Sequence, residues 1–230
     1  MDSELGVHFS IAFVREHAFG VVAGLHLPAG KEPVPETILA RLHPEEAAFA
    51  RSLHGYRQVE WAGGRLAWAA AAARFGARPA PLLSGAEREP LPPPGLSVSI
   101  THKRDLAIAL VGDVARGTLG IDLENEAAPS DGVAERILRP EELLAVAALP
   151  ESARAAAILL RFSVKEATYK AIYPLLRRYV GYSEASVDVA ATGEISVTML
   201  LKDGAEPPGL EATCERLPGR ILSAVRCVGG

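Results

Sequence analysis

Long apolar runs are missing from this sequence of 230 residues. The longest run, residues 66–73, is mostly alanine, whereas a membrane-spanning helix needs about 20 apolar residues. The first residues, MDSELGVHFS, also lack the basic and apolar segments of a secretory signal. We therefore expect no membrane partner and no secretion. Because 49% of the residues are hydrophobic and 23% are charged, a disordered chain is excluded as well.

Cysteine is scarce, with only Cys214 and Cys227 in the chain. They lie on either side of a predicted hairpin turn at residues 218–219. The pairing across that turn places Cys214 opposite Ser223 and Cys227 opposite Leu210, so the two thiols are out of register for a disulfide. Two unpaired cysteines favour a reducing compartment, and we expect the cytoplasm.

An excess of positive charge is missing too. The chain has 24 Lys and Arg against 28 Asp and Glu, for a formal net charge of −4. A general nucleic-acid-binding protein usually has a basic excess or a basic run, so we expect no nucleic acid among the partners. Lysine is rare, and two lysines, Lys165 and Lys170, lie in one short segment.

The hydrophobic pattern predicts an α+β fold with mainly antiparallel strands. Helices are predicted at 44–75 with a break at 54–55, at 133–148 and at 152–180. Strands are predicted at 8–14, 19–27, 96–102, 106–112, 118–124, 185–190, 194–200, 210–216 and 220–228. The proline-rich stretch 76–95 is predicted to be mostly extended loop. We expect two pseudo-symmetric halves, 1–115 and 116–230, each with a mainly antiparallel sheet packed against a long helix.

Two carboxylates lie on one face of the strand predicted at 118–124. Asp122 and Glu124 alternate with Ile121 and Leu123, so the acidic side chains point to the same side. Such a pair repels unless water or a cation separates it, and Mg²⁺ prefers carboxylate oxygens, waters and phosphates as ligands. The alternative is an ordinary strand with an acidic, solvated face.

A second polar group lies on the helix predicted at 152–180. Helical periodicity predicts that Phe162, Tyr169 and Tyr173 form its buried stripe. On an adjacent stripe, Glu166 and Lys170 are spaced as an i,i+4 ion pair. The alternative is a common salt bridge on the helix surface.

Cationic residues that suit phosphate groups are spread over the first half of the chain. His102 ends a predicted strand, Arg57 and Arg65 are close to one side of a predicted helix, and Arg88 lies in the proline-rich loop. Each is most often a solvated surface residue when taken alone. Together with the three carboxylates and Lys170, they fit a Mg²⁺-assisted transfer on a diphosphate.

Two motifs carry a resemblance to a known family. The segments GIDLE (120–124) and FSVKEATYK (162–170) resemble the acidic motifs of the 4′-phosphopantetheinyl transferases. The resemblance is to the monomeric, double-length class of the enterobactin-synthetase and surfactin-synthetase activating type. Weaker motifs follow the same order in HPEE (43–46), in RQVEWAGGR (57–65), in GAEREP (85–90) and in SITH (99–102).

The resemblance implies that the 4′-phosphopantetheine arm of coenzyme A is transferred to a serine of an apo carrier protein, with release of adenosine 3′,5′-bisphosphate. The acceptors would be acyl, peptidyl or aryl carrier domains of nonribosomal peptide and polyketide synthases, as in antibiotic or siderophore biosynthesis. It also implies a monomer that binds coenzyme A in a cleft between its halves, with Mg²⁺ as the metal ion and Mn²⁺ as the alternative.

The resemblance also implies roles for particular residues. The metal ligands would be Asp122, Glu124 and Glu166, and the catalytic group would comprise Asp122, Lys170 and Glu166, the last as base for the serine hydroxyl. The first half would hold the nucleotide, and the second half would hold the metal and the carrier protein. The implied coenzyme A contacts are Arg57, Arg65, Arg88, Glu89, Pro90, Thr101, His102, Lys165 and Lys170. Relatives commonly have an aromatic residue before the proline where this chain has Leu91-Pro92.

Carrier proteins are generally acidic, and the segment 133–139 offers Arg136 and Arg139 beside Val133 and Ile137 as a docking helix. Two other functions stay open at this point. One is a metal-dependent nuclease or phosphodiesterase, which the acidic net charge disfavours. The other is a coenzyme A-binding protein without catalytic activity, which the intact set of carboxylates disfavours.

Overall fold

The computed structural model describes residues 9–78, 80–127, 130, 132–202, 204 and 209–228. The chain divides into two compact units between Arg116 and Gly117. Each unit combines antiparallel strands with one long helix, so the predicted α+β class is confirmed. Among the described residues, no helix is long and apolar enough to cross a membrane.

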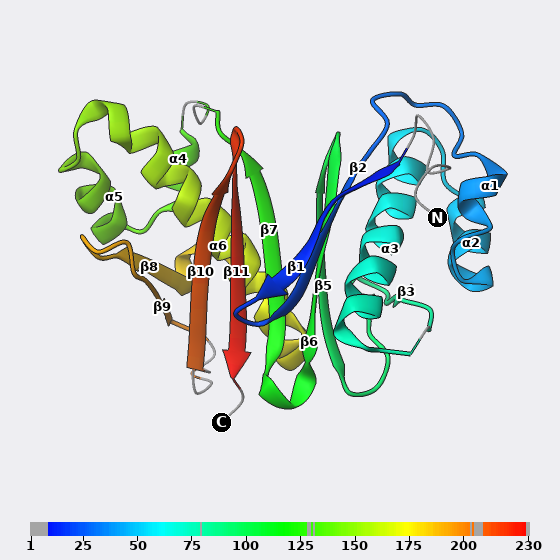
Figure 1. Ribbon diagram of the computed structural model, residues 1–230. Helices are drawn as coiled ribbons and strands as arrows, with labels where there is room; N and C mark the ends of the chain where they lie inside the picture. The colour runs from blue at the N-terminus through cyan, green and yellow to red at the C-terminus, as the bar shows by residue number, and fades with distance from the viewer. Residues whose placement is uncertain are drawn as a thin grey trace. The chain divides into compact units, whose positions relative to one another are not determined.

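The first unit is built on a four-stranded antiparallel sheet in the order β1-β2-β6-β5 (Figure 1). Its strands are β1 Ser10–His17, β2 Gly20–His26, β5 Leu96–Lys103 and β6 Leu106–Asp113. The central strands β2 and β6 are almost entirely buried, which explains their continuous apolar sequence. The first strand was predicted to start at residue 8, which lies outside the described residues.

Small residues let helix α3, Tyr56–Phe75, lie close to this sheet. Its alanines at 62, 67 and 71 are completely buried. A Cβ atom at Gly63 would lie 2.1 Å from Leu27 Cδ2, so a larger residue there would require Leu27 or the helix to move. The remaining elements of the unit are α1 Glu36–Leu39, α2 Pro44–Arg51, β3 Leu83–Ser84, β4 Pro90–Leu91 and η2 Val114–Arg116. The short β3–β4 pair lies in the stretch that was predicted to be loop.

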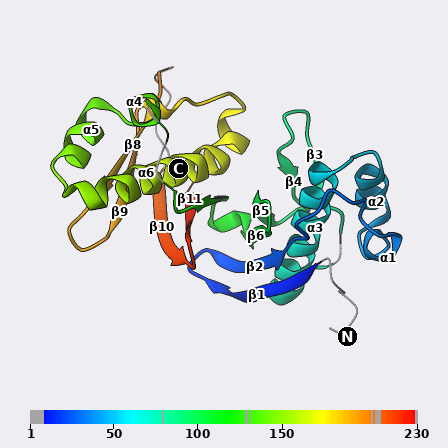
Figure 2. The same ribbon diagram turned by 90° about the horizontal axis from the view of Figure 1, so that it is seen from above.

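The second unit has a three-stranded antiparallel sheet in the order β10-β11-β7, with helix α6 packed against it (Figure 2). Its elements are β7 Thr118–Asn125, α4 Val133–Ile137, α5 Pro140–Ala147, α6 Glu151–Leu176, η3 Tyr182–Glu184, β8 Ala185–Val189, β9 Ile195–Met199, β10 Gly209–Leu217 and β11 Arg220–Val228. The register pairs Cys214 with Ser223 and Leu210 with Cys227, and both cysteines are free, as predicted.

The buried face of α6 differs from the predicted stripe. Phe162, Tyr169 and Tyr173 are only partly buried, whereas Ala167 and Ala171 are completely buried. The reason is the close approach of α6 to β7, where a Cβ atom on Gly120 would lie 1.8 Å from the Ala167 carbonyl oxygen. Bulky rings do not fit into this contact, so they lie at its edges.

Candidate functional site

A pocket of about 610 Å³ in the first unit gathers five of the nine residues predicted to contact coenzyme A. They are Arg57, Arg65, Arg88, Pro90 and His102. The residues come from α3, the β3–β4 region and β5, which are distant in the sequence. The packing of α3 on the sheet therefore creates a pocket with several cationic side chains.

Arg65 lines this pocket and contributes a positive charge to it. Its Nε donates to the Leu82 carbonyl oxygen at 2.9 Å and its Nη2 to Ser84 Oγ at 3.1 Å. Its guanidinium carbon lies 3.5 Å from the centre of the Trp61 ring. Burial lowers the pKa of Arg65 to about 10, so the group stays protonated at neutral pH.

The HPEE motif holds a segment next to the pocket in place through Glu46. Glu46 is buried, and its two carboxylate oxygens accept from the backbone N–H of Leu82 at 2.8 Å and of His43 at 3.0 Å. The His43 contact is part of a capping box at the start of α2. Glu46 thus joins α2 to the segment that carries the Arg65 acceptors, which makes this motif structural.

Two predicted contacts, Thr101 and Glu89, do not line the pocket. Side chains alternate along β5, so the buried Thr101 points away from the face that carries Ile100 and His102. One Glu89 oxygen accepts from the Glu87 backbone N–H at 3.1 Å, which keeps the carboxylate in its own turn. The contacts of Thr101 and Glu89 with coenzyme A therefore stay predictions that this pocket does not support.

The pocket also contains aromatic side chains that the sequence prediction missed. Phe49 on α2 is 46% exposed, and its ring centre lies 4.3 Å from that of Trp61 on α3. Glu60 lies in the same pocket, 3.7 Å from His102 Nδ1. Only the packing of α2 on α3 brings Phe49 here; its sequence context shows no more than an apolar helix position.

In the second unit, Asp122 and Lys170 form a partly buried ion pair. Lys170 Nζ donates to Asp122 Oδ1 at 2.8 Å and to the Ile121 carbonyl oxygen at 2.9 Å. The lysine thus pairs with the strand carboxylate, and not with Glu166 as in the alternative of a salt bridge on the helix surface. The other oxygen, Asp122 Oδ2, is buried and has no hydrogen-bond partner within the part of the chain that the structure describes.

Glu166 lies at a smaller pocket of about 100 Å³ in the same unit. Its Oε1 accepts a hydrogen bond of 2.5 Å from the hydroxyl of Tyr182. Burial raises the pKa of Tyr182, and the hydrogen bond to Glu166 and then the charges of Glu166, Tyr179 and Asp122 raise it further. The rest of the pocket is largely apolar and aromatic, with Tyr169 and Tyr179 on its wall.

The donor set of this unit fits a divalent cation in part. Gly120 contacts α6, and Asp122 and Glu124 follow on the same face of β7, so both acidic side chains project toward the helix that carries Glu166. The unpartnered Asp122 Oδ2 is the oxygen that a cation would satisfy. Across the described ranges, no group of three or more His, Cys, Asp and Glu side chains is already gathered as a metal site.

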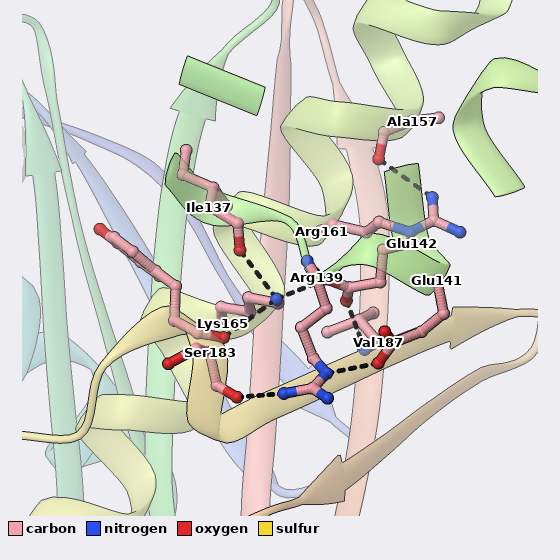
Figure 3. Close-up of polar contacts among 10 residues, drawn as sticks. Ile137, Arg139, Glu141, Glu142, Ala157, Arg161, Lys165, Ser183 and Val187 are labelled. Carbon is pink, nitrogen blue, oxygen red and sulfur yellow. Dashed lines mark hydrogen bonds and ion pairs between the residues drawn. The ribbon is translucent and has the colours of Figure 1, made fainter. Parts of the chain in front are cut away.

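Lys165 is not in a position to contact coenzyme A, which corrects the prediction (Figure 3). Its side chain is 1% exposed, and Nζ donates to Glu142 Oε2 at 2.6 Å. The same ammonium donates to the carbonyl oxygens of Ile137 at 2.9 Å and Tyr182 at 3.1 Å. Three acceptors inside the unit use its donors, so none is left for a phosphate.

Comparison with known proteins places these features in a family. A family model described as the 4′-phosphopantetheinyl transferase superfamily matches residues 118–212, and one for the N-terminal domain of these transferases matches residues 45–112. The chain is 34% identical over 197 residues to the 4′-phosphopantetheinyl transferase PptT of Mycobacterium tuberculosis, which covers 82% of this chain and 81% of that protein. It is also 34% identical over 197 residues to the transferase Svp of Streptomyces mobaraensis, covering 83% and 74%.

Among solved structures, a holo-(acyl-carrier-protein) synthase from Bacillus anthracis matches 50% of this chain and 97% of its own, with 19% identity and a TM-score of 0.42. The identity to the two sequence relatives is enough to assign the family. The chain belongs to the 4′-phosphopantetheinyl transferase superfamily, of the type with an N-terminal domain in front of the transferase domain. It is a 4′-phosphopantetheinyl transferase, the class of enzyme that transfers the 4′-phosphopantetheine arm of coenzyme A to carrier proteins, and this confirms the predicted family and activity.

Proposed function

We propose that this enzyme modifies a serine of apo carrier domains from peptide or polyketide synthases, with Mg²⁺ as the metal ion and Mn²⁺ as a substitute. The observation that carries the proposal is the Asp122–Lys170 pair, in which Asp122 Oδ2 stays buried and unpartnered among the described residues. A buried carboxylate oxygen without a partner is costly, and a cation would remove that cost.

Asp122, Glu124 and Glu166 would hold the ion, which supplies positive charge to the diphosphate of coenzyme A when bound. Lys170 then adds a second positive charge, held by two acceptors on β7. As the serine oxygen bonds to phosphorus, the bridging oxygen leaves with the bisphosphate and gains negative charge. Lys170 stabilises this charge more in the transition state than in the ground state.

Glu166 is the proposed base for the serine proton. It lies at the rim of an apolar pocket in the second unit, and its Oε1 is held by Tyr182. The pantetheine arm is the less polar part of coenzyme A, and part of it would lie against this pocket, whose volume of about 100 Å³ is too small for the whole arm. This arrangement would keep the arm next to the carboxylate that receives the proton.

The pocket of the first unit is proposed to bind the nucleotide of coenzyme A. Arg57, Arg88 and His102 are exposed on its wall and would contact the phosphates. Phe49 supplies a half-exposed ring beside Trp61, on which the adenine can stack. Phe49 would therefore take the place of the aromatic residue that relatives commonly have before the proline, where this chain has Leu91.

The carrier protein is proposed to dock at α4, through Arg136 and Val133. Arg136 is exposed, whereas Ile137 is buried and packs inside the unit. Arg139 donates to the Ser183 carbonyl oxygen and pairs with Glu141, so it is already engaged. The docking surface is thus smaller than the sequence predicted, and its positive charge comes from Arg136.

The test is mass spectrometry of an apo carrier protein after incubation with the enzyme, coenzyme A and Mg²⁺. We expect the carrier to gain the mass of one phosphopantetheine group, and to gain nothing when its acceptor serine is replaced by alanine. Acceptor choice is read from a panel of acyl, peptidyl and aryl carriers, and size-exclusion chromatography checks the proposed monomer. Absence of modification on every carrier, with a folded enzyme, would reject the proposal.

A further inference from the structure

Tyr182 has a contact that the proposed mechanism does not yet use. It begins the short helix η3, and its hydroxyl donates to Glu166 Oε1. Its ring lies 6.0 Å from the ring of Phe162, one turn before Glu166 on α6. The hydroxyl therefore reaches the carboxylate from a different segment of the chain than the helix that carries Glu166.

The backbone of Tyr182 is fixed by a buried junction around Lys165 and Glu142, which are labelled in Figure 3. Its carbonyl oxygen accepts from Lys165 Nζ, which Glu142 Oε2 holds at 2.6 Å. Glu142 Oε1 in turn accepts from the Val187 backbone N–H at 2.7 Å, so α5, α6 and β8 meet at one carboxylate. The far end of η3 is held as well, because Glu184 accepts from Arg178 Nη2 at 2.9 Å.

Because Tyr182 is held in place, its hydrogen bond restricts the Glu166 side chain. A glutamate has several torsions, and without a fixed partner its carboxylate spreads over many rotamers. The phenol donates a strong hydrogen bond to Glu166 without adding charge next to it. Tyr182 uses one acceptor site on Oε1, so the remaining lone pairs of the carboxylate are left for the cation and for the serine proton.

We propose that Tyr182 is a positioning residue that presents Glu166 to the divalent ion. The inference rests on the proposed function, because it takes Glu166 as a ligand of that ion. Tyr182 does not contact the reacting atoms in this scheme. It acts through Glu166, and the Glu142–Lys165 junction acts through Tyr182.

The test compares the wild type with Tyr182→Phe, which keeps the ring against Phe162 and removes only the hydroxyl. Binding of Mn²⁺ to the full chain without coenzyme A is measured by the electron paramagnetic resonance signal of the free ion. We expect the Kd for Mn²⁺ to rise about tenfold, the lower end of the loss that is usual when a residue that orients a metal ligand is removed. In turnover assays at fixed Mg²⁺, kcat falls by a similar factor and KM for coenzyme A stays within about twofold.

Tyr173→Phe is the matched control, because Tyr173 lies on α6 with Glu166 but does not line the pocket at Glu166; its ring contacts Tyr169 on the wall of that pocket. It should leave Kd and kcat unchanged. Glu166→Gln distinguishes a failure of the proposed metal site from a failure of the role proposed for Tyr182. If it binds Mn²⁺ as the wild type does, the proposed metal site fails and the inference with it. If Glu166→Gln loses Mn²⁺ while Tyr182→Phe matches the wild type in Kd and kcat, only the role of Tyr182 is overturned.

Discussion

Replacement of Lys165 by methionine tests the correction that the structure makes to the predicted coenzyme A contacts. Methionine has nearly the same length and no charge, so the change removes the ammonium and little volume. Lys165 and Glu142 are both 1% exposed, and the ammonium has three acceptors within the second unit. The variant leaves the Glu142 carboxylate buried without its counter-ion.

Removal of one partner from a buried ion pair costs about 3–5 kcal/mol. Glu142 keeps two backbone donors, Arg139 N at 2.7 Å and Val187 N at 2.7 Å, so we expect the low end of this range. For a chain of this size, a loss of about 3 kcal/mol lowers the midpoint of thermal unfolding by roughly 6–12 °C. Differential scanning calorimetry measures that midpoint, and urea unfolding measures the free energy.

Lys170→Met is the matched control on the same helix. Lys170 is 29% exposed at its side chain, and its loss should cost no more than about 2 kcal/mol of stability. It should lower kcat at least about tenfold, because it removes charge stabilisation from the transition state. Lys165→Met should instead keep KM for coenzyme A within about twofold at a temperature where it is folded. A stable Lys165→Met enzyme with a strongly raised KM for coenzyme A would refute the buried assignment.

Three further predictions concern separate parts of the chain. Asp122→Asn keeps the shape of the side chain but removes its charge, so transfer to a carrier should be lost in the mass-spectrometric assay. The circular dichroism spectrum should stay unchanged. Substantial residual turnover would show that Asp122 is not a ligand of the metal ion. Phe49→Ala should raise KM for coenzyme A by about tenfold, as expected for loss of one stacked base, with kcat unchanged, and an unchanged KM would reject Phe49 as the adenine platform. Arg178 lowers the pKa of Glu184 below its ordinary 4.5, so this carboxylate stabilises the fold above that pH and the contribution is lost as pH falls through the lowered value. Glu184→Gln should therefore weaken the loss of stability as the pH falls below 4.5 in urea titrations, and an equally steep acid loss would contradict the pKa shift.

Much of the fold could be predicted because it depends on local pattern. Alternating apolar residues and short turns placed most strands of the sheets within a few residues of their observed bounds. The register of one hairpin followed from its turn, so the separation of Cys214 from Cys227 was already determined. The shared face of Asp122 and Glu124 follows from strand alternation alone, and that face does turn toward α6.

The tertiary structure decided which polar side chains point into a pocket and which are buried in the protein. Lys165 and Lys170 are five residues apart, about 140° around a helix, so the two side chains of one motif point in different directions and meet different parts of the unit. Only the positions of β7 on one side and of α5 and β8 on the other show that Lys170 meets Asp122 while Lys165 meets Glu142. Phe49 lines the pocket of the first unit for the same kind of reason, because contacts between segments far apart in the chain leave no periodic signal in either segment.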